Sequence, residues 1–369
     1  MKKIGVVTTQ YAPNYGALLQ TFAMQTYLKE QYGETSAEVV NYFPPHAKDF
    51  WKLFPPRKGI RDLALTVFSM LKPRQLLIRK KRLKVFKTFI QKYLSVSKPY
   101  YTFQELENVE ADYHTLICGS DQIWNITRHD NPAWFLYFSR NWKDCKKIAY
   151  APSVADQIPA GHEENLIKYL ANLDHISVRE DVDVLQLKPY TDKTIHHVCD
   201  PVFLLTPEQW GQYLPEPTIK EPYILCYFIS VGEFAPKVVE KLRQLTGLKV
   251  VHINVNARDK FHSEYDLKAE DPFSFLSYIK NAKYVCTNSF HCTAFSILFQ
   301  KNFLAVRKQT ANSRLESLVR ASGLENRFVD PISLDGLTVE QLQCDYSVSK
   351  MESFIAASKA FLSEALGNE

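Results

Sequence analysis

Short apolar segments alternate with amphipathic ones along the first half of the chain. Lys3–Thr9 has the composition of a buried strand, Ala17–Tyr32 has apolar residues at helical spacing, and Glu38–Tyr42 is a second strand. Further strands are expected at Tyr113–Cys118, Lys147–Ala151, His175–Val178 and His197–Cys199. Strands that alternate with helices in this way are typical of an α/β fold with parallel sheets.

A second alternation begins at Tyr223, after a proline-rich connection at Leu205–Pro222. Strands are expected at Tyr223–Ile229, Lys249–Asn254, Ala282–Thr287 and Asn302–Val306, and helices at Ala235–Thr246, Pro272–Lys280, Cys292–Gln300, Ser313–Ser322 and Thr338–Leu366. The pattern predicts two Rossmann-like domains that face a cleft. The expected domains are residues 1–205, with an insertion at about 43–100, and residues 206–349, while a C-terminal helix in 350–369 can cross back to the first domain.

His291 lies where an expected strand ends and a helix begins. Asn288 and Ser289 precede it, and both are favoured helix N-caps. Ligands of open α/β sheets bind at the carboxyl ends of the strands, and a helix N-terminus suits a phosphate or carboxylate. His291 is therefore either a functional residue or a buried histidine with local hydrogen bonds.

Polar residues follow other strands as well. Asp121 could cap a helix, or it could orient or deprotonate a sugar hydroxyl. Arg179 could bind a carboxylate or phosphate, or form a salt bridge with a neighbour such as Glu180 or Asp183. Trp124 and Trp134 could stack on a sugar ring or pack in the core.

Composition narrows the functional classes. A net charge of +5 and 13% aromatic residues suit an anionic or carbohydrate substrate, and no nucleic-acid-binding module is visible. The seven cysteines have no metal-ligand spacing, which favours reduced, buried thiols and no metal site. The opening βαβ unit lacks G-x-G-x-x-G, so a nicotinamide cofactor is not expected. Neither a signal peptide nor a membrane-spanning segment is evident, which predicts a cytoplasmic protein.

Arg74–Leu94 is an expected helix with a strongly basic face. Its lysines and arginines interleave with apolar residues, and Phe50, Trp51 and Phe54 precede it. The commoner interpretation is an amphipathic helix whose charges face water. The alternative is a surface for anionic lipid or a lipid diphosphate, which would make the protein peripheral at the inner face of the membrane.

Six short motifs resemble, in order, the signature of the polysaccharide pyruvyl transferase family. They are Asn14-Tyr15-Gly16-Ala17 with Gln20, Gly119-Ser120-Asp121-Gln122 with Trp124-Asn125, Ser177-Val178-Arg179-Glu180, Asp200-Pro201-Val202, Ser289-Phe290-His291 and Asn312-Ser313-Arg314-Leu315. The resemblance runs from the first strand to the helix after Arg314. It implies a GT-B-like architecture.

The resemblance also implies an activity, which is the transfer of pyruvate from phosphoenolpyruvate to two hydroxyls of a sugar, giving a cyclic ketal. Phosphoenolpyruvate would be a co-substrate, no cofactor would be needed, and the acceptor saccharide could be linked to a lipid diphosphate. His291 matches the motif histidine, a candidate general acid, and Asp121 is the second candidate catalytic residue. The candidate donor-binding residues are Arg179, Arg314, Ser289 and Asn288, with Arg307 and Lys308 as reserves. The candidate acceptor-binding or cleft residues are Asn14, Gly16, Gln20, Gly119, Ser120, Gln122 and Trp124.

The chain departs from the family pattern around His291. Ser289 stands where some members have arginine, and Cys292 stands where glycine is common. Two consequences stay open: one donor contact comes from elsewhere, or the donor binds in a different pose. No motif around Cys292 indicates an activated thiol. Two other functions share these features: a GT-B-type glycosyltransferase that uses a nucleotide sugar, and a sugar-binding module without catalysis.

Overall fold

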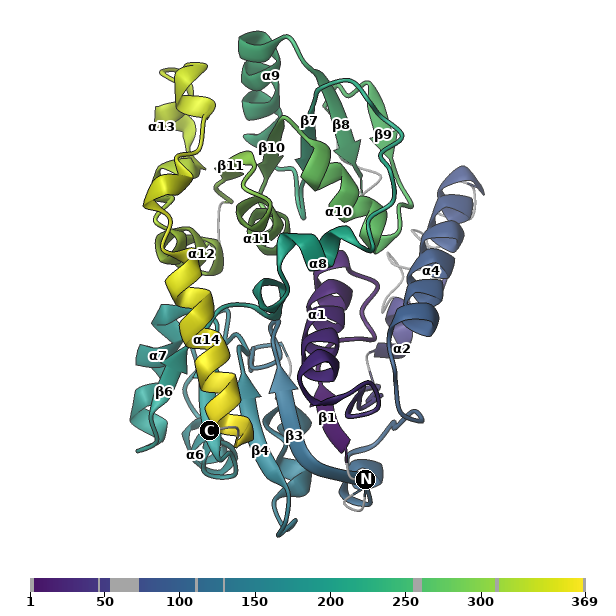
Figure 1. Cartoon of the computed structure of the whole chain (residues 1–369), viewed down its shortest axis with the longest axis vertical. Helices are drawn as coiled ribbons and strands as arrows, with labels where there is room; N and C mark the ends of the chain where they lie inside the picture. Colours follow the sequence, from purple (N-terminus) through teal and green to yellow (C-terminus); the bar gives the residue numbers. More distant parts are fainter. Residues whose placement is uncertain are drawn as a thin grey trace. The chain divides into compact units, whose positions relative to one another are not determined.

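The computed structural model of the chain describes residues 3–45, 47–53, 73–109, 112–128, 130–254, 261–308 and 312–367. The chain forms two units, each with its own sheet (Figure 1). The first unit comprises Met1–Lys48, Ile90–Leu205 and Lys350–Glu369, and the second comprises Asp49–Phe89 and Thr206–Ser349. Part of the expected insertion at about 43–100 thus groups with the second unit.

The first unit contains a six-stranded parallel sheet of order β2-β1-β3-β4-β5-β6. The strands are β1 (Lys3–Val7), β2 (Ala37–Val39), β3 (Tyr113–Gly119), β4 (Lys146–Tyr150), β5 (His175–Val178) and β6 (Ile195–His197). Successive side chains of β3 enter opposite clusters: Leu116 and Cys118 join one core, and Ile117 joins the other. Because β2 and β3 lie on opposite sides of β1, the strand order reverses there, and this switch point is where open α/β sheets bind ligands.

Helices cover both faces of this sheet, as an all-parallel sheet requires. The first, α1 (Tyr15–Tyr32), begins at its N-cap Asn14 and ends at Gly33, whose φ of 100° suits glycine. The others in the described part of this unit are α5 (Phe103–Glu107), α6 (Glu163–Ala171), α7 (Asp181–Leu187) and α14 (Met351–Leu366), with α2 (Ala47–Phe50) at its boundary.

The C-terminal helix α14 packs on the first sheet. Phe361, Leu362 and Ala365 are buried in the cluster that contains Ile4, and the Ser358 hydroxyl accepts a hydrogen bond from the backbone N–H of Cys199 at 2.8 Å. The expectation of a helix throughout Thr338–Leu366 was wrong, because α14 begins only at Met351.

A buried arginine explains the interruption before α14. Arg327 donates hydrogen bonds from Nη1 to the carbonyls of Gln341 and Gln343, each at 2.9 Å. A continuous helix would need these carbonyls for its own N–H groups. The segment therefore forms only two short 3₁₀ turns, at Glu340–Leu342 and Tyr346–Val348.

The second unit repeats the plan with a parallel sheet of order β12-β11-β10-β7-β8-β9. Its strands are β7 (Tyr223–Tyr227), β8 (Lys249–Ile253), β9 (Tyr265–Leu267), β10 (Tyr284–Thr287), β11 (Asn302–Val306) and β12 (Phe328–Val329). Its helices include α8 (Pro207–Gly211), α9 (Ala235–Thr246), α10 (Pro272–Asn281), α11 (Phe290–Leu298), α12 (Ser313–Ser322) and α13 (Pro331–Leu334). The strand order reverses at β7, so the switch point lies between β7 and β10.

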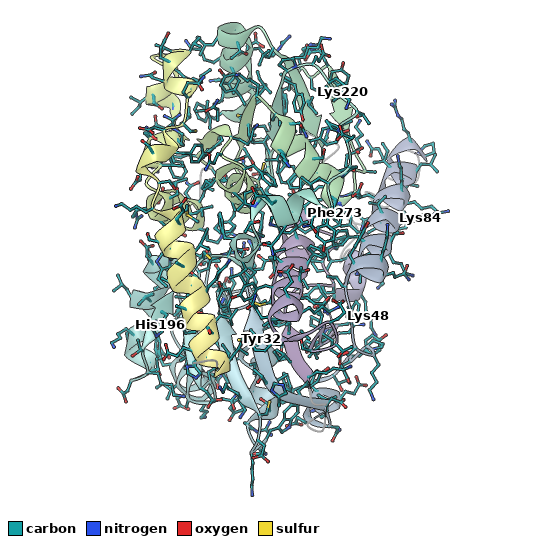
Figure 2. The ribbon with its side chains drawn as sticks, viewed as in Figure 1. Tyr32, Lys48, Lys84, His196, Lys220 and Phe273 are labelled. Carbon is teal, nitrogen blue, oxygen red and sulfur yellow. The ribbon has the colours of Figure 1, made fainter. Side chains whose placement is uncertain are left out.

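The basic helix is α4 (Pro73–Tyr93), and its part up to Phe89 belongs to the second unit. Phe86 and Phe89 are its buried residues, and the Phe89 ring meets Phe273 of α10 with centroids 5.0 Å apart. Figure 2 labels Lys84 on this helix and Phe273 on α10. Phe54 lies outside the described residues.

Two further expectations concern the cysteines and the membrane. All seven cysteines are free thiols, and all except the half-buried Cys344 are buried. In the part of the chain that the structure describes, no helix has the length and apolarity needed to cross a bilayer.

Candidate functional site

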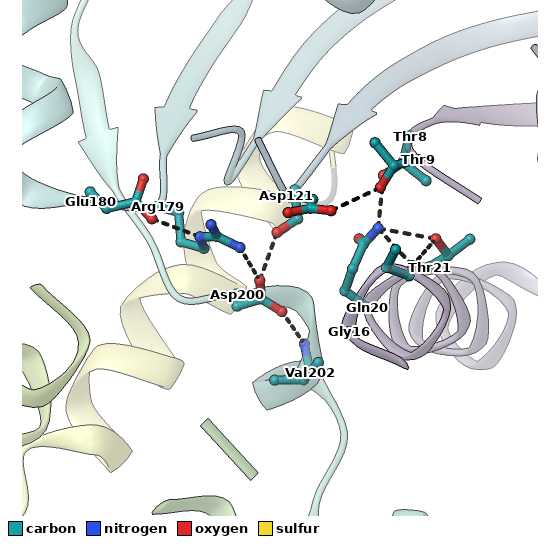
Figure 3. Close-up of polar contacts among 12 residues, drawn as sticks. Thr8, Thr9, Gly16, Gln20, Thr21, Asp121, Arg179, Glu180, Asp200 and Val202 are labelled. Atoms are coloured by element: carbon teal, nitrogen blue, oxygen red, sulfur yellow. Dashed lines mark hydrogen bonds and ion pairs between the residues drawn. The ribbon is translucent and has the colours of Figure 1, made fainter. Parts of the chain in front are cut away.

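The carboxyl ends of β1 and β3 meet at the switch point of the first sheet (Figure 3). The Thr9 hydroxyl, which follows β1, donates a hydrogen bond to Asp121 Oδ2 at 3.1 Å. Ser120 and Asp121 follow β3 with φ values of 21° and 62°, a region that only aspartate, asparagine and glycine enter readily. Asp121 is a partly exposed residue at this edge of the sheet.

A buried ionic network lies behind Asp121. Arg179 donates from Nε to Glu180 Oε1 at 2.8 Å and from Nη1 to Asp200 Oδ2 at 2.9 Å. The Ser120 hydroxyl donates to the same Asp200 oxygen at 2.7 Å. Asp200 therefore ties the end of β5 to the strained loop after β3, and Figure 3 shows this connection.

The sequence allowed two roles for Arg179, a salt bridge or the binding of a ligand. In the structure, Arg179 forms salt bridges with Glu180 and Asp200. Its side chain is 1% exposed, and those of Glu180 and Asp200 are 1% and 0% exposed. Burial alone would lower the pKa of Arg179, but the Glu180 and Asp200 carboxylates outweigh burial and raise that pKa. The guanidinium is thus a permanent buried cation with two carboxylate partners.

A second buried acid adjoins this network. Burial, and next the charge of Glu180, raise the pKa of Asp183 to about 9. Asp183 Oδ2 accepts a hydrogen bond from the backbone N–H of Val154 at 2.9 Å. Asp183 therefore keeps a proton at neutral pH. Sequence reasoning named it only as a salt-bridge partner of Arg179, because burial and the approach of Glu180 leave no signature in the sequence.

Three candidate residues near the start of α1 have local structural contacts. The Asn14 side chain caps the helix by accepting from the N–H groups of Gly16 and Ala17 at 2.9 and 3.3 Å. Gln20 is 1% exposed and donates from Nε2 to the Thr8 hydroxyl at 2.8 Å. These contacts join the end of β1 to the first turns of α1.

The remaining candidates of the first unit lie on or just after β3. Gly119 is its last residue, and Gln122 is partly exposed in the following turn. Trp124 packs in the core, where it stacks on Phe135 with centroids 4.7 Å apart and donates from Nε1 to the Trp134 carbonyl at 3.0 Å. Trp124 and Trp134 are each 1% exposed. Of the two alternatives, stacking on a sugar or packing in the core, both tryptophans therefore show core packing.

The second sheet has a comparable arrangement at the ends of β7 and β10. Asn288 follows β10; its Oδ1 accepts from the N–H of Ile229 at 2.9 Å, and its Nδ2 donates to the Ser230 carbonyl at 2.7 Å. Both bonds reach the segment after β7. Asn288 therefore fixes the two strand ends at the switch point to each other.

His291 lies in the first turn of α11, next to this junction. The helix begins at Phe290 rather than at the expected Cys292, because the Ser289 hydroxyl acts as N-cap and accepts from the N–H of Cys292 at 3.4 Å. His291 is 9% exposed, and its ring lies edge-on to Phe290 with centroids 5.2 Å apart. The expected placement of His291 at the boundary between strand and helix is confirmed.

Cys292 differs chemically from its neighbour His291. It is fully buried, and burial raises the pKa of its thiol to about 12. Almost none of it is thiolate at neutral pH. The structure thus agrees with the sequence-based view that Cys292 is not an activated nucleophile.

The candidate cations of the second unit follow β11, the strand beside β10. Arg314 lies half-buried in the first turn of α12. Arg307 pairs with Glu316 at 2.8 Å and lies over the Phe328 ring at 5.0 Å. The backbone N–H of Lys308 donates to Asn312 Oδ1 at 2.9 Å, just before α12. Arg314 and His291 thus lie after adjacent strands of one sheet.

Among the residues that the structure describes, no group of three or more His, Cys, Asp or Glu side chains could hold a metal ion.

Comparison with solved structures supports the fold. The chain is similar to a UDP-N-acetylglucosamine 2-epimerase structure with a TM-score of 0.54 and 12% identity, over 99% of this chain and 96% of the other. It is also similar to the UDP-GlcNAc 2-epimerase of Neisseria meningitidis bound to UDP-GlcNAc (TM-score 0.54, 10% identity, 100% of both chains) and to MnaA of S. aureus with UDP (TM-score 0.50, 13% identity, 98% and 91%). At these identities the likeness shows the fold alone, which is GT-B-like.

Comparison at the level of sequence identifies the family. No curated protein matches the chain. The family model described as polysaccharide pyruvyl transferase matches residues 14–307. This range contains Asn14, Asp121, Arg179 and His291, whereas Arg314 lies beyond it. Because the match covers most of the chain, the protein belongs to the polysaccharide pyruvyl transferase family.

Proposed function

We propose that the protein transfers pyruvate from phosphoenolpyruvate to two hydroxyls of a saccharide, forming a cyclic ketal in the biosynthesis of a capsular or exocellular polysaccharide. The observation that carries the proposal is the family match over residues 14–307, which includes His291 in the first turn of α11. Phosphoenolpyruvate is the co-substrate, and the reaction requires no further cofactor.

His291 is the general acid of the proposed reaction. It donates a proton to the methylene carbon of phosphoenolpyruvate, which becomes a methyl group, and the adjacent carbon becomes electrophilic. One sugar hydroxyl attacks that carbon, and a second hydroxyl closes the ketal as the bond to phosphate breaks. Of the two hydroxyl protons, one balances the proton given by His291 and the other leaves with inorganic phosphate.

Asp121 acts on the saccharide in this proposal. Asp121 is the partly exposed member of a network whose other charged members are buried. The carboxylate would accept a hydrogen bond or a proton from an attacking hydroxyl. The bond from Thr9 and the buried contacts of Ser120 hold it in place.

Donor binding requires groups that complement one carboxylate and one phosphate. The N-terminus of α11 supplies partial positive charge beside His291, and the half-buried Arg314 supplies a guanidinium at the same edge of the sheet. Arg179 would contribute indirectly, because its side chain is buried between two carboxylates. Arg314 is the residue of this set that we expect to touch the donor.

Calorimetry on the purified protein tests the donor class. We expect phosphoenolpyruvate to bind and to release phosphate when a suitable saccharide acceptor is added, whether free or linked to a lipid diphosphate. Binding and turnover of a nucleotide sugar, with neither for phosphoenolpyruvate, would instead identify a glycosyltransferase. Saccharide binding without turnover of either donor would identify a binding module.

A further inference from the structure

The helix α4 carries an excess of positive charge that its packing leaves in solvent. Its 21 residues include no acidic side chain, and the basic ones are Arg74, Arg79, Lys80, Lys81, Arg82, Lys84, Lys87 and Lys92. A charge run on a helix is often only a solvated face. The distribution of these basic residues around α4 shows whether they form a binding surface.

The lysines and the arginines near the middle of α4 point to different sides. Lys80, Lys81, Lys84 and Lys87 are exposed, and Leu77, one turn before them, is 66% exposed. Because positions three, four and seven residues apart share a helix face, these five residues form one outward surface, here called the lysine face. Figure 2 shows Lys84 projecting away from the helix.

The opposite side of α4 is used for packing. Phe86 and Phe89 are buried, and Arg82 lies over the Phe86 ring at 5.6 Å. Arg79 is half-buried and donates from Nη2 to the Lys52 carbonyl at 2.8 Å. The lysine face is therefore held outward by a packed helix.

Charge and composition indicate the partner of the lysine face. Four ammonium groups at helical spacing complement a surface with diffuse negative charge, and the nearby Glu270, which interacts with Lys81, offsets only part of their charge. Surfaces that bind single-stranded nucleic acid usually add aromatic side chains that stack on bases, and none of the exposed residues of α4 is aromatic. The exposed Leu77 suits the boundary between lipid headgroups and acyl chains. We propose that the lysine face binds the surface of an anionic phospholipid bilayer.

The test is sedimentation with vesicles of phosphatidylcholine, with and without phosphatidylglycerol. Each lysine near an anionic surface strengthens binding by about five-fold. The variant with Lys80, Lys81, Lys84 and Lys87 all changed to Gln should therefore bind the anionic vesicles at least ten-fold more weakly. Wild-type binding should fall steeply between about 0.05 M and 0.5 M salt, because screening shortens the reach of surface charge to a few ångströms.

A matched control separates this surface from net charge alone. Lys143, Lys188, Lys220 and Lys350 are exposed lysines on other elements, and changing all four to Gln alters net charge by the same amount. This control should keep wild-type binding within about two-fold, because these lysines are scattered rather than aligned on one face. If the variant of the lysine face does not fold by circular dichroism, Lys84→Glu with Lys87→Glu replaces it.

Three results would overturn the proposal. Wild-type protein could ignore anionic vesicles at low salt. Both four-lysine variants could lose binding equally, which would make the effect one of net charge. Transfer RNA could bind at least as tightly as the anionic vesicles and depend on the same four lysines, which would make the lysine face a nucleic-acid surface. The vesicle assay requires no turnover, so its outcome is independent of the proposed reaction.

Discussion

His291 and Cys292 are adjacent in the first turn of α11, yet their environments suit them to different roles. The Cys292 thiol is fully buried and its pKa is raised to about 12, which removes it as a nucleophile at neutral pH. His291 keeps 9% of its surface exposed beside the junction of β7 and β10. Variants of these two residues therefore provide a test and a matched control within one helical turn.

We expect His291→Ala to lower turnover with phosphoenolpyruvate by roughly 10²–10⁴, the usual contribution of a general acid. Cys292→Ala should stay within about three-fold of wild type, because the buried thiol takes no part in proton transfer. Phosphate release measures both variants, and circular dichroism checks their folding. If His291→Ala kept nearly wild-type turnover, His291 would have a structural role and not a catalytic one.

The buried acid Asp183 makes stability depend on pH in an unusual direction. An unfolded aspartate has a pKa of about 3.9, whereas in the folded protein the pKa of Asp183 is about 9. Between these values the folded state holds a proton that the unfolded state has released. The contribution of Asp183 to stability is thus complete below about pH 4 and is lost as the pH rises toward 9.

Urea denaturation at about pH 7 and pH 8.5 measures this effect. We expect the free energy of unfolding of wild type to fall by roughly 1–2 kcal/mol over this interval. Asp183→Asn should show a smaller fall, because an amide does not titrate and its oxygen can still accept from the Val154 N–H. Buried cysteines affect both proteins alike, so identical pH dependence would mean that Asp183 is ionised in the folded state.

At the scale of elements, the buried network stabilises the conformation of the loop after β3. Ser120 and Asp121 have left-handed backbone conformations, which persist only where surrounding contacts hold them. The bonds from Ser120 and Arg179 to the same oxygen of Asp200 provide such contacts. The shape of the Asp121 loop thus depends on residues that are buried behind it.

Arg179→Ala should therefore destabilise the first unit by about 3–5 kcal/mol, because it leaves two buried carboxylates without their cation. The exposed Arg128 of the same unit provides the control, and Arg128→Ala should change stability by less than about 0.5 kcal/mol. Chemical denaturation gives both values. A stable Arg179→Ala variant that has lost affinity for phosphoenolpyruvate would restore the direct donor contact implied by the family resemblance.

The sequence predicted several elements with the bounds that the structure shows. The helices Ala235–Thr246 and Ser313–Ser322 and the strand Asn302–Val306 have their expected bounds. The edge strands β9 and β12 were missed, because three and two residues are too few to show a pattern.

For the site residues, the sequence predicted their positions but not their accessibility to a ligand. Their positions at strand ends followed from local pattern, and His291, Asp121 and Arg179 lie where the sequence predicted. Which of them a ligand can reach did not follow, because burial comes from partners distant in the chain: Thr9 is 112 residues from Asp121, and Asp200 is 21 residues from Arg179. Pairs of this kind are visible only in the folded structure.

At the scale of the whole molecule, α14 completes a unit whose two other segments end at Lys48 and Leu205, more than a hundred positions earlier. Leu362 is fully buried with Ile4 and Val6 of β1. Leu362→Ala should lower the free energy of unfolding by about 2–5 kcal/mol. Glu364→Ala, on the exposed side of α14, should be nearly neutral. Equal midpoints of denaturation for the two variants would contradict this role of α14.

The division of the chain also sets an order for its synthesis. The polypeptide passes between the two units four times, and all residues of the second unit precede α14. A ribosome therefore releases every part of the second unit before the first unit can bury Ile4 and Val6 under Leu362. Although domains usually fold from the N-terminus during synthesis, here the unit that contains β1 is finished only after the unit that contains β7. Until then, Ile4 and Val6 can pack only against members of their cluster that precede α14, such as Met24 and Leu28 of α1.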